Sequence, residues 1–433
     1  MKITFVYPSF ERHGQAHPEL LKYVACNEYI GPPSLGIASV AAATPEGHEI
    51  EFWDDRVQPF SADHQADLFA LSYFTPAATR AMEIGDELKK RGKKVVMGGI
   101  FPSMMPELAA PHCDAVVVGE GEPVWPQVVA DAAAGQLKPR YQASAPADLS
   151  TLKPPRVDLY LNAEREGYRP DDYPLQVSRG CPLACDACVL PIYLGKKSRF
   201  FSDSNLTATM KAFAERGKLV SLTEDTSFFP GARKSFRAFL ELVLALQREG
   251  VKVKLSYIGI SMPMILNLDA TLLAQLKATG IDRFYLVGGF DPITRDAFGK
   301  GDPAALDKAT RCIQRCHEVG IDPYVSFLAG NPEDDEGTFD RMLEFARKTK
   351  IDLAEFCVST PYPNTPFWHR YLKEDRIFDR TWKHYNDANV VFRPYKMSPE
   401  RLQEGYLYLW REFYKGRETD LTQRDHTRRT IQF

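Results

Sequence analysis

The 433-residue sequence has no long apolar run, few cysteines and almost no net charge. Its longest apolar stretch, around residues 35–43, is much shorter than the roughly 18 uncharged residues of a membrane span. A formal net charge of −3 gives no reason to expect a surface that binds nucleic acid. The opening segment, residues 1–7, is typical of a strand and not of a signal peptide. Together these absences predict a cytoplasmic protein with no membrane span and no nucleic-acid partner.

A disulfide framework is not expected in so long a chain without a signal peptide. Most of the eight cysteines are too scattered for a zinc site made of two paired motifs. Cys312 and Cys316 are four residues apart on an expected helix, and we interpret them as buried packing residues. The exception is one short loop, on which Cys181, Cys185 and Cys188 follow the spacing C-x3-C-x2-C.

Three thiolates on one loop can bind three irons of a [4Fe–4S] cluster and leave the fourth iron without a protein ligand. An open position on a metal is where a substrate binds at catalytic metal sites in general. Clusters that only transfer electrons usually have four cysteine ligands. The loop therefore predicts a catalytic cluster bound by Cys181, Cys185 and Cys188.

Short apolar segments alternate with helical segments along most of the chain, which predicts an α/β fold with parallel sheets. We expect residues 1–140 to form a doubly wound, Rossmann-like domain. Residues 141–172, rich in Pro, Ala and Asp, are expected to be a linker. Six strand–helix units in residues 173–364 predict a partial (β/α)6 barrel, and residues 365–433 a small, mostly helical C-terminal region.

Each expected strand of the first domain ends in glycine, proline or hydroxyl residues. Ligands of open α/β sheets bind at that edge, where glycines let the backbone approach them closely. No G-x-G-x-x-G sequence follows the first strand, which disfavours a dinucleotide. In the barrel, the three-cysteine loop also follows the first strand, at the end where functional residues of barrels lie.

With these motifs, the sequence resembles the cobalamin-binding branch of the radical S-adenosylmethionine (SAM) superfamily, the class B methyltransferases. The resemblance covers nearly the whole chain. Its strongest segment is Ser178-Arg-Gly-Cys-Pro-Leu-Ala-Cys-Asp-Ala-Cys188. Weaker matches fall at residues 32–37, 97–102, 118–122, 197–202, 330–335 and 360–366. Residues 390–400 and 410–414 resemble the C-terminal extension of hopanoid-methylase-like members.

This resemblance implies three cofactors, namely a [4Fe–4S] cluster, SAM and cobalamin. It places four residues at SAM positions: Ala187, where the family often has an aromatic residue, Glu224, Asp225 and Asp291. It assigns the strand-end residues of the first domain to cobalamin: Pro8, Ser72, Thr75, Gly98, Gly99, Gly119, Glu120 and Gly121. The alternatives are solvated carboxylates at the SAM positions and simple turns at the glycines.

Many cobalamin proteins supply the lower cobalt ligand through an Asp-x-His-x-x-Gly motif. None of the nine histidines of this chain has an aspartate two residues before it. We therefore predict that cobalamin binds without a histidine ligand from that motif.

The resemblance implies a C-methyltransferase that acts on an unactivated carbon through a 5′-deoxyadenosyl radical and methylcobalamin. Its expected partners are a small-molecule substrate and an external, flavodoxin- or ferredoxin-like electron donor. Two alternatives remain: an oxidative cyclase or ring-rearranging enzyme of the same architecture, and a non-catalytic cobalamin-binding protein. Since six strands cannot close a barrel, the C-terminal region is expected to cover the open side. The candidates for a substrate-facing wall are Trp368, Tyr385, Phe392 and Trp410.

Overall fold

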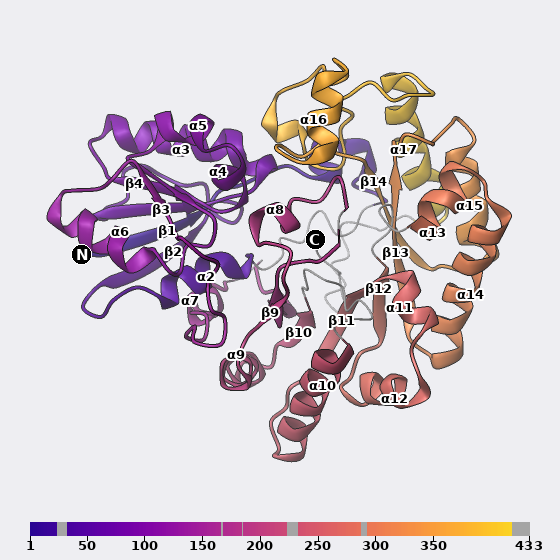
Figure 1. The fold of residues 1–433 in the computed structure, drawn as a ribbon, viewed down its shortest axis with the longest axis horizontal. Coiled ribbons are helices and arrows are strands. Elements are labelled where there is room, and N and C mark those ends of the chain that lie inside the picture. Colours follow the sequence, from indigo (N-terminus) through magenta and orange to yellow (C-terminus); the bar gives the residue numbers. More distant parts are fainter. Residues whose placement is uncertain (24–32, 166–167, 184, 223–232, 287–291, 418–433) are drawn as a thin grey trace.

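The computed structural model describes residues 1–23, 33–165, 168–183, 185–222, 233–286 and 292–417. Two parallel sheets of six strands each form the centres of two domains that lie side by side, with the C-terminal helices beside the second (Figure 1). The predicted α/β architecture is therefore confirmed.

The first sheet has the strand order β2-β1-β3-β4-β5-β6, and all its pairs are parallel. The chain first moves from β1 to β2 on one side and then crosses to β3 on the other. Such a reversal opens a crevice beyond the carboxyl ends of the strands. The strands are β1 (Lys2–Tyr7), β2 (Glu49–Asp54), β3 (Leu68–Ser72), β4 (Val95–Gly98), β5 (Ala115–Val118) and β6 (Arg140–Gln142).

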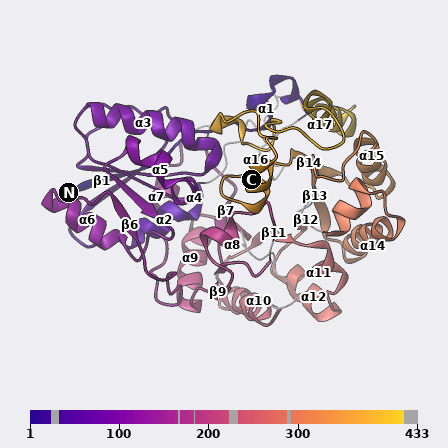
Figure 2. The ribbon, with the colours of Figure 1, turned by 45° about the horizontal axis from the view of Figure 1, so that its top comes forward.

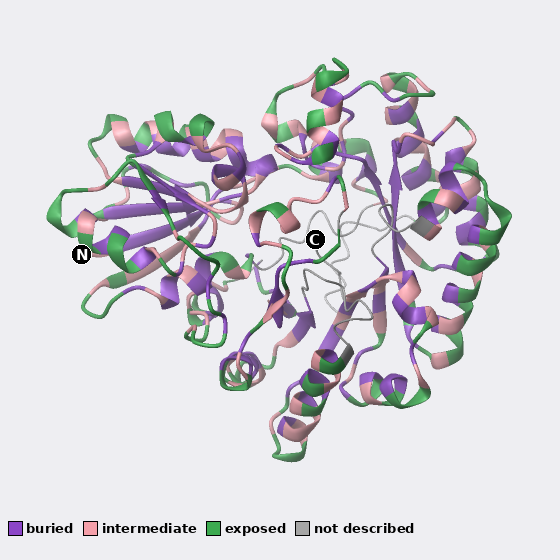
Figure 3. Cartoon of the chain, viewed as in Figure 1, coloured by how far each residue is buried: buried purple, intermediate pink, exposed green. Residues whose placement is uncertain are grey.

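Helices cover both faces of this sheet, so its central strands are buried on both sides (Figure 3). Leu68 packs on one face with α2 and α6, while the next residue, Phe69, packs on the other with α3. The helices of this domain include α2 (Leu35–Ala42), α3 (Ala78–Lys90), α4 (Ile100–Met104), α5 (Pro106–Ala109) and α6 (Trp125–Ala134).

The segment 141–172, expected to be an extended linker, contains a short helix, α7 (Asp158–Asn162), that packs on the first domain. Tyr160 is fully buried there. Its hydroxyl donates to the carbonyl of Ser34 at 2.7 Å and accepts from the backbone N–H of Ala38 at 3.0 Å. These two bonds attach the segment to the start of α2, which an apolar pattern alone does not indicate.

The second sheet follows the order of the chain, β7-β10-β11-β12-β13-β14, with all pairs parallel. This is the strand order of an open β/α barrel, as predicted. Its strands are β7 (Asp172–Leu175), β10 (Leu219–Leu222), β11 (Leu255–Ile260), β12 (Arg283–Leu286), β13 (Asp322–Ala329) and β14 (Leu353–Val358).

Helices between these strands form the outer layer of the barrel. They include α9 (Asp203–Glu215), α10 (Arg233–Arg248), α12 (Ala270–Ala278), α14 (Pro303–Val319) and α15 (Thr338–Lys348). Side-chain oxygens of Ser202, Asp269 and Asp302 cap α9, α12 and α14. Cys312 and Cys316 are completely buried on α14, as predicted for packing residues. No described helix is long and apolar enough to cross a membrane.

The C-terminal region contains α16 (Pro366–Lys373) and α17 (Pro399–Tyr414) and lies against the last barrel strand (Figure 2). The indole N–H of Trp410 donates to the carbonyl of Phe356 in β14 at 3.1 Å. A Cβ atom at Gly405 would lie 2.1 Å from the ring of Phe339, so glycine permits the close approach of α17 to α15. The predicted helical C-terminal region is confirmed.

Candidate cofactor and substrate site

The three-cysteine loop is closed at its base by a small antiparallel pair, β8 (Ser178–Arg179) with β9 (Arg199–Phe200). Gly180 has a φ of +91°, and a Cβ atom there would lie 2.4 Å from the carbonyl oxygen of Lys197. The N–H of Cys181 donates to the carbonyl of Gly195 at 3.0 Å. Glycine before the first cysteine is therefore required for the loop to close.

The three cysteines of the loop differ in their exposure. Cys181 is buried at 5% exposure, whereas Cys185 and Cys188 are partly exposed, and none of the three is in a disulfide. The N–H of Cys188 approaches the carbonyl of Cys185 at 3.3 Å, so the last two cysteines lie on one turn. Three thiolates on one loop fit three irons of a [4Fe–4S] cluster. Their assignment as ligands stays a prediction.

The C-terminal region contacts the cluster loop between its last two cysteines. The N–H of Phe367 in α16 donates to the carbonyl of Asp186 at 2.9 Å, and the guanidinium of Arg370 pairs with the carboxylate of Asp186 at 2.9 Å. Ala187, the predicted SAM neighbour, is 4% exposed and belongs to the hydrophobic core. The other predicted SAM residues, Glu224, Asp225 and Asp291, lie outside the described residues.

A buried ion network connects the cluster loop to the first domain. Arg179, two residues before Cys181, donates to Glu120 at 2.9 Å and to Glu122 at 2.8 Å. Arg199 donates to the other oxygen of Glu120 at 2.8 Å. Arg179, Glu120 and Glu122 are all below 8% exposure. The Gly-Glu-Gly-Glu motif of the first domain thus binds the base of the cluster loop, and the assignment of Glu120 to cobalamin stays a prediction.

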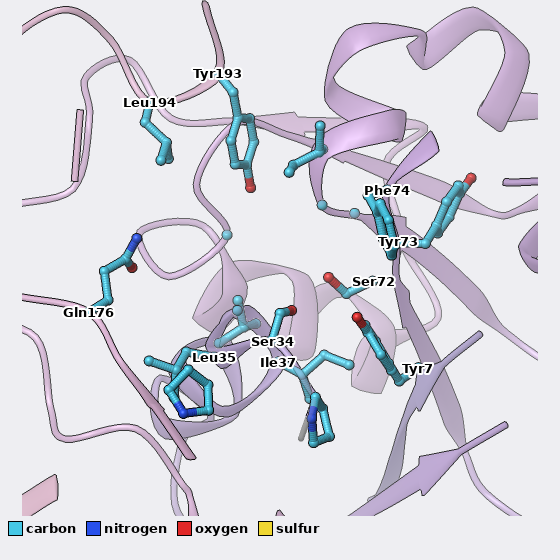
Figure 4. Close-up of a pocket in the computed structure, with 18 of the residues that line it drawn as sticks. Tyr7, Ser34, Leu35, Ile37, Ser72, Tyr73, Phe74, Gln176, Tyr193 and Leu194 are labelled. Atoms are coloured by element: carbon cyan, nitrogen blue, oxygen red, sulfur yellow. The ribbon is translucent and has the colours of Figure 1, made fainter. Parts of the chain in front are cut away.

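A cavity of about 680 Å³ lies between the carboxyl edge of the first sheet and the barrel. In Figure 4, Tyr7, Ser34 and Ser72 of the first domain lie across the cavity from Gln176 and Tyr193 of the barrel domain. Six of the eight residues predicted to contact cobalamin line it: Ser72, Gly98, Gly99, Gly119, Glu120 and Gly121. Pro8 and Thr75 are outside this lining, and Thr75 is buried at the start of a 3-10 helix.

The glycines at this edge form a cradle for a large ligand. Gly119 has a φ of +82°, and a Cβ atom there would meet nothing within 4 Å, which leaves room for a bound group. Gly99 has a φ of +94°, and its Cβ would lie 2.8 Å from the backbone of Tyr73. The described residues that line the cavity include no histidine. This lining fits cobalamin held without a histidine ligand, which stays a prediction.

One polar part of the cavity lining carried no sequence signal. It consists of residues from three distant parts of the chain: Arg12, Tyr362, Asn386 and Asp387. The hydroxyl of Tyr362 donates to Asp387 at 2.7 Å, and Asp387 has a φ of +63°, which is uncommon for a residue with a side chain. Burial raises the pKa of Asp387. A strained, desolvated aspartate at a cavity is typical of a functional position.

The four aromatic residues expected to form a substrate wall are not among the residues that line this cavity. Tyr385, Phe392 and Trp410 have at most 2% exposure, and Trp368 is half-buried beside His369. Tyr385 donates to the carbonyl of Asp379 at 2.8 Å. These rings pack the C-terminal region against itself and the barrel, and its cavity residues are the polar Asn386 and Asp387.

The structure thus defines a class of two-domain proteins in which both domains line one cavity. The first is a doubly wound domain with glycines at the carboxyl edge of its sheet, and the second is an open barrel with a three-cysteine loop. The B12 binding domain family matches residues 22–129, and the Radical SAM superfamily matches residues 175–346. The chain thus combines a B12-binding domain with a radical SAM domain. These domains imply a [4Fe–4S] cluster, SAM and cobalamin as the cofactors.

Relatives span nearly the whole chain. The bacteriochlorophyllide d C-12(1)-methyltransferase of Chlorobaculum tepidum is 28% identical, over 88% of this chain and 82% of that protein. The C-8(2)-methyltransferase of the same organism is also 28% identical, over 89% of this chain and 86% of that protein. Among solved structures, the radical SAM methyltransferase TsrM from Kitasatospora setae has a TM-score of 0.66 at 18% identity. The match covers 94% of this chain and 83% of TsrM, and it shows a shared fold.

Proposed function

We propose that the protein is a cobalamin-dependent radical SAM C-methyltransferase that modifies an unactivated carbon of a small molecule. The observation that carries the proposal is the shared cavity. The glycine edge of the B12-binding domain and the barrel segments next to the cysteine loop line the same space. Two cofactors that act on one substrate carbon need such a common space.

When bound, the cluster with SAM supplies a 5′-deoxyadenosyl radical and methylcobalamin supplies the methyl group. The chain provides binding, orientation and exclusion of water. Gly98, Gly99 and Gly119 allow close approach of a flat macrocycle to the backbone. Cys181, Cys185 and Cys188 would hold the cluster. The ion pairs of Arg179 keep these two positions in a fixed relation across the domain interface.

The lining of the cavity also favours a class of substrate. Phe10, Leu35 and Phe74 give its first-domain side an apolar surface, while Arg12 and Asp387 belong to its polar part. We propose a largely apolar substrate that carries at least one polar group, which the polar part binds. Bacteriochlorophyllides, the substrates named for two relatives, have this character and are the first compounds to test.

We also propose that an acidic, flavodoxin- or ferredoxin-like protein of the cytoplasm supplies the electron. Three of the large hydrophobic residues that are exposed in the described part of the chain, Leu183, Ile192 and Phe200, belong to the cluster-loop segment. Lys196 and Lys197 are exposed on the same segment. An apolar surface with two lysines suits an acidic protein partner. Reversing both lysine charges should slow cluster reduction by flavodoxin and leave reduction by dithionite unchanged.

The test of the proposed reaction is an anaerobic incubation with reductant, candidate substrate and SAM labelled with deuterium in its methyl group. Methylation predicts 5′-deoxyadenosine, S-adenosylhomocysteine and a substrate that has gained the labelled methyl. A cyclase or rearranging enzyme would give 5′-deoxyadenosine and an unlabelled, altered substrate. That second result would overturn the proposal in favour of the alternative.

A further inference from the structure

His13, Glu355 and Cys357 place three potential metal ligands in one buried cluster, separate from the cluster loop. One ligand atom from each lies within 4.8 Å of the other two, and the residues are 3%, 4% and 7% exposed. His13 begins α1 (His13–Ala16), shortly after the first strand of the B12-binding domain, and the other two lie on β14. We propose that this cluster binds a divalent metal ion, for which zinc is the best match.

The imidazole of His13 lacks a partner that a metal would supply. Its Nδ1 atom lies 2.7 Å from the hydroxyl of Tyr406, whereas its Nε2 atom is buried and has no hydrogen-bond partner among the described residues. Buried polar atoms are ordinarily hydrogen-bonded or coordinated. A ring nitrogen of histidine is among the commonest zinc ligands in proteins.

Glu355 is a buried carboxyl group whose hydrogen-bond donors are mostly hydroxyls, with the positive charge of Arg12 acting on it as well. Its carboxyl oxygens accept hydrogen bonds from Tyr285 at 2.8 Å and Tyr324 at 3.2 Å, and it forms no ion pair with the described residues. An isolated buried carboxylate is costly, and a divalent cation removes that cost by direct coordination.

The donor set and its spacing select the kind of metal. In a tetrahedral zinc site, bonds of about 2.0 to 2.3 Å place the ligand atoms roughly 3.3 to 3.8 Å apart. The sulfur of Cys357 and the Oε1 atom of Glu355 are 3.7 Å apart, which already meets this spacing. The remaining pairs, at most 4.8 Å apart, need a contraction of no more than about 1.5 Å. Nitrogen and sulfur donors exclude magnesium and calcium as the preferred ions.

Neighbouring hydroxyls form an outer layer around these ligands. Tyr406 of α17 contacts His13, while Tyr285 and Tyr324 contact Glu355. Such outer partners orient ligands at metal sites and contribute to affinity. The bound ion would join the N-terminal segment, the last barrel strand and the C-terminal helix at one point. Because Arg12 precedes His13 and lines the cavity, the ion would also fix that side of the cavity.

The test uses the full-length protein with Cys181, Cys185 and Cys188 all replaced by Ala, so that the cluster loop cannot bind metal. The protein is incubated with Co²⁺ as a spectroscopic probe in the absence of cobalamin, and unbound metal is removed. We expect one equivalent of Co²⁺ and the charge-transfer absorption of a cobalt–thiolate bond. Zn²⁺ should displace the Co²⁺ and raise the unfolding temperature.

Matched variants identify the ligands. Cys357→Ser should abolish the charge-transfer absorption, and His13→Ala should abolish retention of Co²⁺. Cys113→Ser, at a buried thiol of the first domain, should change neither. Tyr406→Phe keeps all three ligands and should weaken binding by about 10- to 100-fold without removing it. A parent protein that retains no Co²⁺, or an absorption that persists in Cys357→Ser, overturns the proposal.

Discussion

Buried carboxyl groups have opposite pKa shifts in the two domains. In the B12-binding domain, Asp55 pairs with Arg80 at 2.8 Å, and despite its burial this pairing and nearby backbone N–H groups lower its pKa to about 2. In the barrel, Asp172 accepts a hydrogen bond from the hydroxyl of Ser256 and has no ion pair among the described residues. Burial raises the pKa of Asp172 to about 6.

The same contrast, between carboxyl groups with and without an ion pair, distinguishes two larger clusters of buried side chains. Glu120 and Glu122 are fully paired with arginines, and their charges serve to connect the two domains. Glu355 is hydrogen-bonded to hydroxyl groups and forms no ion pair with the described residues. Ion pairs in the first domain stabilise the glycine edge that lines the cavity. Carboxyl groups of the barrel without an ion pair are able to bind ligands or to exchange protons.

The largest predicted effect is at the domain interface. Replacing Arg179 by Met leaves Glu120 with one partner and Glu122 buried and unpaired, so the protein should lose about 3 to 5 kcal/mol of stability. The measurement is chemical denaturation of the cofactor-free protein. Adding Glu122→Gln to Arg179→Met should restore part of the loss. A loss below about 1 kcal/mol would mean that this network is not a structural connection.

The pH dependence of stability should have opposite signs in the two sheets. Asp172 binds its proton more tightly when folded, so its burial costs stability as the pH rises from about 4 to above 6. Asp55 binds its proton less tightly when folded, so its contribution is present above about pH 4 and is lost as the pH falls towards 2. Shifts of about two units correspond to roughly 2 to 3 kcal/mol in each case.

Denaturation of Asp172→Asn and Asp55→Asn at several pH values tests this prediction. Relative to the unmodified protein, Asp172→Asn should become more stable between pH 4 and pH 7. Asp55→Asn should be less stable at neutral pH and approach the unmodified protein in acid. Parallel stability curves for all three proteins would contradict the assigned pKa directions.

A pair of glycines tests the cobalamin cradle. Gly119 and Gly135 both have positive φ and open space around a Cβ atom, but only Gly119 lines the cavity. Alanine at either position should cost a similar 1 to 2 kcal/mol or so of stability. Only Gly119→Ala should weaken cobalamin binding, by about tenfold or more, in a titration followed by absorption. Equal cobalamin affinity in the two variants would exclude Gly119 from the site.

The smallest effect is expected at the outer side of the cluster loop. Arg370 and Asp186 are both more than a third exposed, so their ion pair is screened by water. Arg370→Met should therefore change stability by less than about 1 kcal/mol, several-fold less than Arg179→Met. A larger loss would show that the C-terminal region, and not the first domain, is the main support of the loop.

The sequence predicted what depends on local pattern. Short segments of sequence, without their distant contacts, were enough to predict the two series of strands, the cysteine loop and most of the glycine edge. The pairing of Arg179 with Glu122 could not be predicted in this way, because 57 residues separate them and either could face water. The two residues belong to separately recognised motifs, and this is the signal that could have suggested the contact.

In the C-terminal region, residue type alone did not predict which side chains line the cavity. Tyr385 and Trp410 were expected at the cavity because large aromatic rings suit an apolar wall, but the same rings suit a core equally well. Burial decides between the two roles, and it depends on how α17 docks on β14. Asp387, beside Tyr385, gave no sequence signal because its position depends on a left-handed backbone and on Tyr362.

The most direct test of the account is whether the two domains present their cofactors to one shared cavity. Protein reconstituted with both a reduced [4Fe–4S] cluster and cob(II)alamin contains two paramagnetic centres, and pulsed electron paramagnetic resonance measures their dipolar coupling. We predict a resolved coupling in the intact protein, and its loss or broadening in Arg179→Met. Two independent signals without coupling in the intact protein would contradict a common site.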